Sequence, residues 1–500
     1  MIDVHRMMTK VQDQKDALLF RRQYVIGSSF IPKLPGWKHL VINNQFHVTA
    51  HPELETAQVQ KDEKQITLLG YIFDPQNPYH SNEEILEDIM GCISDFEDVI
   101  LQVDRMGGRF VLIYNDVFQV KILHDPCGLR QVFYTVGERE VWCGAQPEIL
   151  QYSMEKRFAY DDEALEFIKS PQYEKTERVW PGDGTIYKHV KHLMPNHYLD
   201  AVTGETVRFW PRKRLEPVDI QEAVRTAKEV LQNSIKAAEH RYSLMLSVSA
   251  GWDSRTLLAA SKDVRHKIFY YVSKYGQLSA DCPDIRVPRR LLDRLGLDFH
   301  VLDCNEEMDE EFAKVLENNV TMARSLPKTR IIYRHFKSSQ GKLNICGNAS
   351  EIARKCIYTH YYKKKITASF LAQISFLKGC SYAISQYDKW LQEVRHFEPQ
   401  YGINLYDLHY WEQRIGTWGA MYPAEQDIAI EEFWPYNNRK LLTTIMSVEE
   451  KYRKPPHYIL FRELIKEMWD DTLSEPINPM DFVESMKKRL RRAYVTYILR

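Results

Sequence analysis

Hydrophobic and polar positions alternate in short segments along the first 210 residues, with turn-forming residues between them. Such alternation is typical of strands that bury one face, whereas Asn82–Cys92 and Asp161–Ile168 carry the wider spacing of amphipathic helices. His197–Asp200 and Val207–Trp210 flank a turn at Gly204 and predict a hairpin. These elements together predict an α+β fold. The remaining predicted strands are Trp37–Ile42, Ile66–Phe73, Arg109–Tyr114, Val117–Leu123, Gln131–Thr135 and Val141–Cys143.

The pattern changes after Pro211, where helical segments begin to alternate with short apolar strands. This alternation favours an α/β fold with a doubly wound parallel sheet. From about residue 360 onward the pattern is mainly helical, so we predict two domains, residues 1–212 and 213–500. The predicted strands are Tyr242–Ser249, Lys267–Ser273, Phe299–Leu302 and Leu343–Cys346, and the predicted helices are Val218–Glu239, 254–262, Ile285–Leu295 and Glu310–Asn318.

The junction Ser249–Ser254 (Ser-Ala-Gly-Trp-Asp-Ser) follows an apolar strand and precedes a helix. A helix N-terminus presents unpaired N–H groups and a positive dipole end, which suit phosphate. Asp253 would repel a phosphate unless it held a divalent cation that bridges phosphate oxygens. We therefore predict a nucleotide phosphate site here, with a ligand-free turn as the alternative. Neither a Walker nor a Rossmann glycine pattern is present to compete with this reading.

The same hexapeptide resembles the Ser-Gly-Gly-x-Asp-Ser pyrophosphate loop (PP-loop) of the ATP pyrophosphatases, in particular the asparagine synthetase branch. Ala250 replaces the first glycine, which costs about 1 kcal/mol if that position needs a positive φ and almost nothing otherwise. The resemblance implies an ATP site, and the end of the next strand could meet the adenine edge. The predicted ATP-binding residues of these two strand ends are Leu246, Ser247, Ser249, Ala250, Gly251, Asp253, Ser254, Val272 and Ser273.

The segment Cys346–Glu351 resembles the second motif of that family, Gly-x-Gly-Ala/Ser-Asp-Glu, in which the aspartate shares magnesium with the first loop. In this register Gly347 is the first glycine, a further ATP-binding residue, and Glu351 is the metal-binding acid. The resemblance thus implies Mg²⁺ held between Asp253 and Glu351. The alternative for Glu351 is a helix-start residue near the N-terminal dipole.

Two residues depart from the second motif: Ala349 replaces its second glycine and Ile352 its final glutamate. Because that glutamate positions aspartate in asparagine synthetases, Ile352 argues against simple asparagine formation. Arg354 could meet a phosphate or a substrate carboxylate, or could lie on a solvated helix face. The family also uses a late lysine, for which Lys454 is our candidate, while Lys487 and Lys488 belong to a basic run that we interpret as an exposed helical face. The predicted catalytic residues are Asp253, Glu351, Asn348, Arg354 and Lys454.

Three N-terminal segments, Leu69–Phe73, Met106–Tyr114 and Leu123–Tyr134, resemble the glutaminase domain of asparagine synthetases, an Ntn-hydrolase-like sandwich. The nucleophile of that domain is a cysteine at residue 1, with its own α-amine as base. This chain begins Met-Ile, and Leu69 stands where the family has an oxyanion-binding asparagine. We therefore predict a degenerate domain without glutamine hydrolysis, as in β-lactam synthetases.

These resemblances imply an ATP-dependent, AMP- and pyrophosphate-forming amide ligase that adenylates a carboxylate and transfers it to ammonia or a substrate amine. A biosynthetic pathway for a natural product or a surface polysaccharide would use such an enzyme. Two alternatives stay open: a non-catalytic nucleotide-binding or scaffold protein, and another PP-loop reaction on RNA or a nucleobase.

Composition narrows the partners and the compartment. The 67 basic and 68 acidic residues balance, so we expect no nucleic acid partner. No uninterrupted apolar run approaches the length of a membrane span, and the eight scattered cysteines lack a paired metal or redox spacing. We expect a cytoplasmic protein that binds small-molecule carboxylate and amine substrates and no membrane, and the sequence leaves room for a homodimer.

Overall fold

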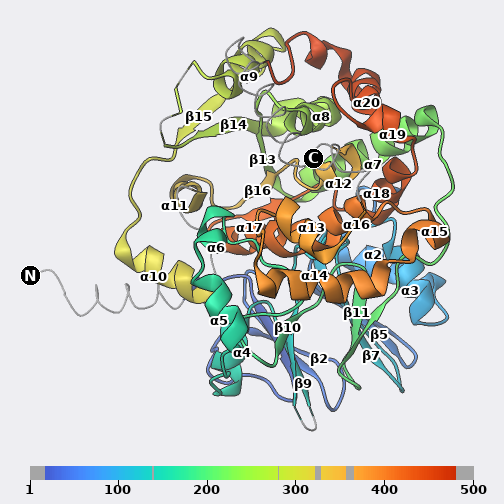
Figure 1. The fold of residues 1–500 in the computed structure, drawn as a ribbon, viewed down its shortest axis with the longest axis vertical. Helices are drawn as coiled ribbons and strands as arrows, with labels where there is room; N and C mark the ends of the chain where they lie inside the picture. Colours follow the sequence, from blue (N-terminus) through green and yellow to red (C-terminus); the bar gives the residue numbers. More distant parts are fainter. Residues whose placement is uncertain are drawn as a thin grey trace, which may run out of the picture.

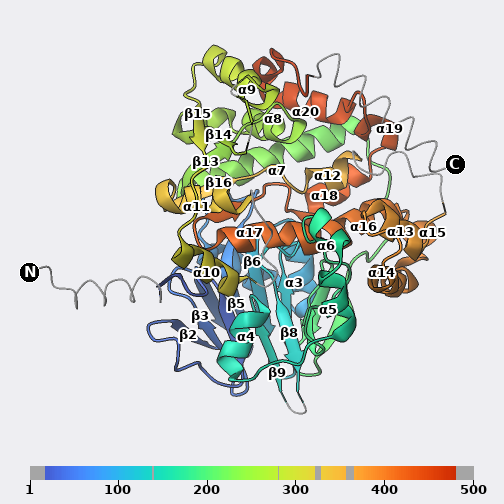
Figure 2. The same cartoon turned by 60° about the vertical axis from the view of Figure 1, so that its left-hand side comes forward.

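The computed structural model describes residues 17–479, apart from 138–139, 277, 280, 321–327 and 356–364. The N-terminal part (residues 17–212) lies at the bottom of Figures 1 and 2, and the C-terminal part (residues 213–479) lies above it. Within the described residues, no helix has both the length and the apolar character needed to span a bilayer.

Two six-stranded antiparallel sheets build the N-terminal part, which confirms the predicted α+β architecture of this part. The predicted strand at 117–123 is wrong at its start, because residues 117–119 belong to the turn before β7. The predicted strand at 207–210 likewise ends earlier, at Arg208. The first sheet has the order β10 (Val190–His192), β8 (Phe133–Val136), β9 (Val141–Gly144), β1 (Tyr24–Gly27), β3 (His47–Ala50) and β2 (Lys38–Val41), and the second has the order β12 (Glu205–Arg208), β11 (His197–Asp200), β7 (Val120–His124), β6 (Gly107–Asn115), β5 (Lys64–Phe73) and β4 (Thr56–Lys61).

Helix α2 shows how the sequence fixes an element locally. Ser81 accepts a hydrogen bond from the amide of Glu84, and the Glu84 carboxylate accepts one from the amide of Ser81, so two otherwise unpaired donors are satisfied. Ile85 and Ile89 then lie on one buried face. The helices of this part are α2 (Asn82–Cys92), α3 (Phe96–Val103), α4 (Pro147–Met154), α5 (Asp162–Ile168) and α6 (Pro171–Lys175).

A five-stranded parallel sheet forms the centre of the C-terminal part, as predicted from the alternation of strands and helices. The sequence pattern missed its fifth strand, β17 (Glu431–Phe433), because three residues within a helical region carry no usable period. Its strand order is β15 (His300–Asp303), β14 (Ile268–Lys274), β13 (Ser243–Ser247), β16 (Lys342–Ile345) and β17.

Helices surround this sheet and cover the boundary with the N-terminal part (Figures 1 and 2). The helices of the C-terminal part are α7 (Ile220–Arg241), α8 (Trp252–Ala260), η1 (Lys262–Lys267), α9 (Pro283–Arg294), α10 (Glu310–Asn319), α11 (Lys328–Ser338), α12 (Ser350–Arg354), α13 (Ala368–Ile374), α14 (Ser381–Val394), α15 (Phe397–Tyr401), α16 (Leu405–His409), the π-helix η2 (Tyr410–Gly419), α17 (Ala420–Gln426), α18 (Arg439–Met446), α19 (Glu450–Arg453), α20 (Ile459–Trp469) and η3 (Asp470–Leu473).

The two parts share one hydrophobic cluster, which runs from β5 and β6 into α7, α18 and α20. Phe73 and Phe433 meet edge to face across the boundary, with ring centroids 5.0 Å apart. Because apolar surface is buried continuously across it, the boundary is part of the core. The predicted division after residue 212 stays a prediction.

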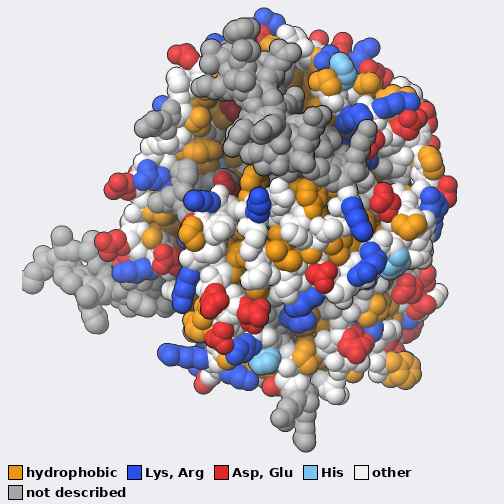
Figure 3. Space-filling view, in the orientation of Figure 1, with side chains coloured by type: hydrophobic (Ala, Val, Ile, Leu, Met, Phe, Trp, Pro, Cys, Tyr) orange, Lys and Arg blue, Asp and Glu red, His pale blue; other side chains and the backbone are white. Residues whose placement is uncertain are grey.

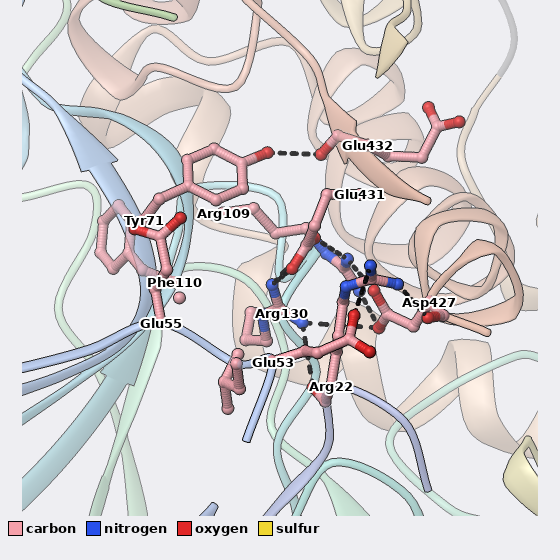
Figure 4. A network of polar contacts seen from close by, with 12 residues as sticks. Arg22, Glu53, Glu55, Tyr71, Arg109, Phe110, Arg130, Asp427, Glu431 and Glu432 are labelled. Carbon is pink, nitrogen blue, oxygen red and sulfur yellow. Dashed lines mark hydrogen bonds and ion pairs between the residues drawn. The ribbon is translucent and has the colours of Figure 1, made fainter. Parts of the chain in front are cut away.

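A buried network of charges also joins the two parts (Figure 4). Arg109 of β6 makes a bidentate pair with Asp427, at 2.5 and 2.7 Å, and reaches Glu431 at 2.9 Å. Arg130 holds Glu431 at 2.9 and 3.1 Å, and Arg22 donates to the main-chain carbonyl of Asp427 at 2.5 Å. Burial would raise the pKa of Glu431, but Arg130 and Arg109 outweigh it and lower this pKa to about 2.

Arg109→Met should destabilise the protein strongly. The variant leaves Asp427 and Glu431 buried with fewer positive partners, and breaking a buried ion pair costs about 3–5 kcal/mol. Urea denaturation should therefore show a large fall in the free energy of unfolding. As a control, Lys228→Met removes an exposed partner 3.8 Å from Glu467 and should change this energy by less than about 1 kcal/mol. Equal effects of the two substitutions would contradict the role given to the network.

Candidate active site

The loop between β13 and α8 is held by its own hydroxyl groups. The hydroxyl of Ser254 accepts from the amide of Ser249 at 3.1 Å and lies 3.1 Å from the Ser249 hydroxyl, which accepts from the amide of Gly251 at 3.2 Å. Gly251 is the N-cap residue of helix α8 and supplies no side-chain cap. The amides of its first turn make no hydrogen bond to a described residue, so this helix end fits an anion.

Two other segments meet this loop. Asp284, in the first turn of α9, accepts a hydrogen bond from the amide of Ala250 at 3.1 Å. The chain after η3 crosses the loop, since the amide of Asn478 donates to the carbonyl of Ala250 at 2.8 Å. The buried Arg255 fixes this crossing segment through the carbonyls of Thr472 and Glu475, at 2.7 and 2.8 Å.

The second loop, between β16 and α12, lies directly against the first. Arg354 donates to Oδ2 of Asp253 at 2.8 Å, and the Ser350 hydroxyl donates to Oδ1. Gly347 is required for this approach, because a Cβ atom there would lie 2.7 Å from Cβ of Asp253 and 3.1 Å from its main-chain carbon. The structure therefore brings together Asp253, Gly347, Glu351 and Arg354.

Glu351 is half-buried beside Asp253. Burial, and then the negative charge of Asp253, raise the pKa of Glu351 to about 7, while Arg354 opposes the shift. Its Oε2 is shielded from solvent and hydrogen-bonds to no described residue. A buried acceptor without a partner is unfavourable, so this oxygen is suited to a ligand that brings positive charge.

These carboxylates fit a magnesium site of the kind that substrate phosphates complete. Among the described residues, no group of three or more acidic, histidine or cysteine side chains could hold a metal alone. Mg²⁺ is usually bound by one or two carboxylates together with phosphate oxygens and water. Asp253 and Glu351 could supply the protein ligands, although Asp253 is neutralised by Arg354 in this arrangement.

The remaining predicted residues lie at varied distances from this centre. Leu246 and Ser247 end β13, and Val272 and Ser273 lie beside them near the end of β14, where Ser247 pairs with Tyr271. Asn348 lies in the second loop, before α12. Lys454 is half exposed and lies 3.9 Å from Glu450, and no ion pair among the described residues joins it to Asp253 or Glu351. Lys487 and Lys488 lie outside the described residues.

The two alanine replacements differ in their backbone. Ala250 does not have a positive φ, so the loss of glycine there costs little strain. Ala349 has a φ of 72°, in the left-handed region where a Cβ atom is unfavourable by about 1–2 kcal/mol. The second loop therefore keeps the conformation that its glycine pattern suggests, with an alanine held in it.

The sequence alone assigned no role to Ser350 or Asp284. Ser350 lies inside the recognised motif, so its position was available, but its bond to Asp253 depends on the approach of two distant loops. Asp284 lies 34 residues from Ala250, and no local pattern identifies such a contact.

Comparison with known proteins gives limited information. No family model and no curated protein matches this chain. Among solved structures, glutamine phosphoribosylpyrophosphate amidotransferase from B. subtilis in complex with ADP and GMP has 9% identity over 62% of this chain and 88% of its own, with a TM-score of 0.26. Glutamine-dependent NAD⁺ synthetase from Acinetobacter baumannii, in complex with ADP, has 15% identity over 34% and 33%, with a TM-score of 0.20. An allosteric regulatory enzyme of purine biosynthesis has 10% identity over 61% and 75%, with a TM-score of 0.25. TM-scores below 0.5 do not establish a common fold.

Gly347→Ala should disrupt the contact between the two loops. The new methyl group would overlap Asp253, so one loop must move and the Asp253–Arg354 pair must lengthen. Overpacking of this kind costs about 1–3 kcal/mol, and thermal unfolding should report it. The matched control is Gly91→Ala in α2, where a Cβ atom meets nothing within 4 Å. That variant should gain up to about 1 kcal/mol, and a similar gain in Gly347→Ala would contradict the packing described.

Glu351→Gln should stabilise the protein increasingly as pH rises. Between the ordinary pKa of 4.5 and about 7, the unfolded chain loses this proton before the folded protein does. The free energy of unfolding of the wild type therefore falls as pH rises through this window, and glutamine removes that fall. The stability difference between variant and wild type should grow between about pH 5 and about pH 8. Glu467→Gln, at an exposed site, is the control for the loss of a carboxylate.

Proposed function

We propose that this protein is an ATP-dependent amide ligase that cleaves ATP to AMP and pyrophosphate. The supporting observation is the meeting of the two loops, with an uncapped helix end at Gly251 and two carboxylates at Asp253 and Glu351. Both loops follow carboxyl ends of neighbouring parallel strands, β13 and β16, where open α/β sheets bind ligands.

In this proposal the first turn of α8 and the serine hydroxyls bind the pyrophosphate part of ATP. Asp253 and Glu351 would hold Mg²⁺, which would draw charge from the leaving pyrophosphate. Arg354 would then release Asp253 and turn to a phosphate or to the substrate carboxylate. The substrate carboxylate attacks the α-phosphorus to give an acyl-adenylate, and an amine next displaces AMP to form the amide.

The amine in this proposal is ammonia or a second substrate, and glutamine is not the source. Leu69 of β5 is fully buried and offers no side-chain donor where the resembled glutaminase has an asparagine. We place the pathway in natural-product or surface-polysaccharide biosynthesis and the protein in the cytoplasm, as proposals from the resemblance.

A nucleotide-binding protein without turnover is the second candidate. The observation in its favour is that Arg354 and Ser350 already occupy both oxygens of Asp253, while the candidate lysine, Lys454, pairs with Glu450. Such a site could bind the phosphates of a nucleotide without positioning a metal ion for catalysis.

The two candidates can be separated by the products formed from ATP. Incubation with ATP, Mg²⁺ and candidate carboxylates should give AMP and pyrophosphate on chromatography, with no glutamate released when glutamine is added. Asp253→Asn should lower the rate by at least about 10²-fold, since it removes a charge that stabilises the leaving group. The control Asp263→Asn, in η1, where the carboxylate pairs with the partly exposed Lys236, should be near wild type.

Two results would count against the ligase. ADP and phosphate as sole products would contradict the proposed reaction. Tight ATP binding without turnover for any carboxylate would support the second candidate.

A further inference from the structure

A cavity of about 600 Å³ lies between the N-terminal part and the helices of the C-terminal part, away from the two loops. Its walls come from β10 and the residues before it, from α14, and from the π-helix η2. This volume lies within the range that small-molecule sites occupy, about 300–1,000 Å³. The cavity therefore has the size and the composite origin of a ligand site.

The π-helix that lines the cavity is an independent sign of function. Segments of π-helix are rare, usually a single turn long, and frequent at functional sites, whereas η2 extends over 10 residues. It contributes the neighbouring residues Glu412 and Gln413, both buried, to the cavity wall. Gln413 accepts from the amide of Gly182 at 2.8 Å, so the π-helix holds the opposite wall in place.

The floor of the cavity is formed by those of its described lining residues that are buried, and it carries no uncompensated charge. Glu412 is the one charged residue among them. Its carboxylate accepts from Arg208 at 2.6 and 3.0 Å, from Trp390 at 2.8 Å and from Asn196 at 2.8 Å. His192 is neutral, because burial and then His124 lower its pKa to about 3. A charged ligand group would find no opposite charge on this floor and would lose its hydration.

The floor instead offers neutral hydrogen-bonding groups beside flat rings. Gln386 presents an amide donor and an acceptor, Gln413 presents its amide donor because its oxygen already accepts from Gly182, and Tyr382 adds a hydroxyl. Nε2 of His192 hydrogen-bonds to no described residue, and a ligand hydroxyl could satisfy it in either tautomer. Trp390, Tyr134 and Tyr187 supply aromatic surface. This combination matches a ring with an apolar C–H face and a hydroxyl edge.

The rim does not favour an anion either. Lys191 pairs with Asp183 at 3.3 Å and Lys188 with Asp162 at 3.5 Å. A third lysine of the lining, Lys389, shares the rim with the acidic residues Asp161, Glu163 and Glu393. Figure 3 shows basic and acidic side chains interspersed over the face that carries α14 in Figure 1. A phosphorylated ligand would need a cluster of one sign.

We propose that this cavity is a binding site for an uncharged, hydroxyl-rich ligand of one or two sugar rings. The site is distinct from the two loops, and the inference does not depend on the proposed ligase activity.

The test is binding of glucose, N-acetylglucosamine and maltose to the full chain, measured by saturation-transfer NMR and calorimetry. At least one sugar should bind saturably. Tyr382→Phe keeps the ring and removes one hydroxyl, so it should weaken binding about three- to tenfold. Gln386→Ala should weaken it by at least about tenfold. The matched control is Gln392→Ala on the exposed side of α14, where the amide bonds only to Asp388, and it should leave affinity unchanged.

Circular dichroism and thermal unfolding check that each variant is folded. If Gln386→Ala does not fold, the conservative variant Tyr382→Phe still tests the proposal. The proposal is overturned if none of the three sugars saturates at up to about 10 mM. It is equally overturned if a sugar binds with the same affinity to the wild type and to Tyr382→Phe and Gln386→Ala.

Discussion

The buried pairing of Arg109 and Arg130 with Asp427 and Glu431 determines how the rest of this molecule is arranged. These charges fix the start of β17 against the N-terminal part, and β17 pairs in parallel with β16. The amide of Cys346 then donates to the carbonyl of Phe433 at 2.9 Å, which places the start of the second loop. A buried ion pair seldom adds stability over apolar packing of the same volume, because desolvation offsets the attraction. The network is better understood as fixing a unique arrangement of the two parts, so that the loop before Glu351 meets the loop before Asp253.

At the candidate site, the two loops and the helices that follow them carry three neighbouring ionisable side chains: Asp253, Glu351 and Arg354. Asp253 is neutralised by Arg354, and burial together with the negative charge of Asp253 raises the pKa of Glu351. A divalent cation would reverse both features, since it would lower the pKa of Glu351 and compete with Arg354 for Asp253. Under the proposed function, the cation and the nucleotide would therefore be bound together, and Arg354 would be displaced toward the incoming anion. Gly347 permits this balance, because no larger residue allows the two loops to approach so closely.

The sequence predicted the classes of fold in both parts and the two loops, because each depends on local signals: alternation of period two, helical period, and short motifs at strand ends. It missed β17, which has three residues and is defined only by its neighbour. It also missed the charge network, since Arg109 and Asp427 are 318 residues apart and neither has a local signature. The glycine pattern of the second motif did anticipate backbone strain, which the structure places at Ala349. The roles of Asp284 and Ser350 depend on which loops come together, and a single sequence does not contain that information.

One helical rod connects these features. From Leu405 to Gln426 the backbone stays helical through α16, η2 and α17. Asp407, near the start of the rod, lies 3.6 Å from Lys355, which directly follows α12, and 3.3 Å from Arg453 of α19. Glu412 lies within the rod and lines the cavity. Asp427 directly follows the rod and belongs to the charge network. A ligand in the cavity could influence the two loops through this rod only if it bound one position of the rod more tightly than another.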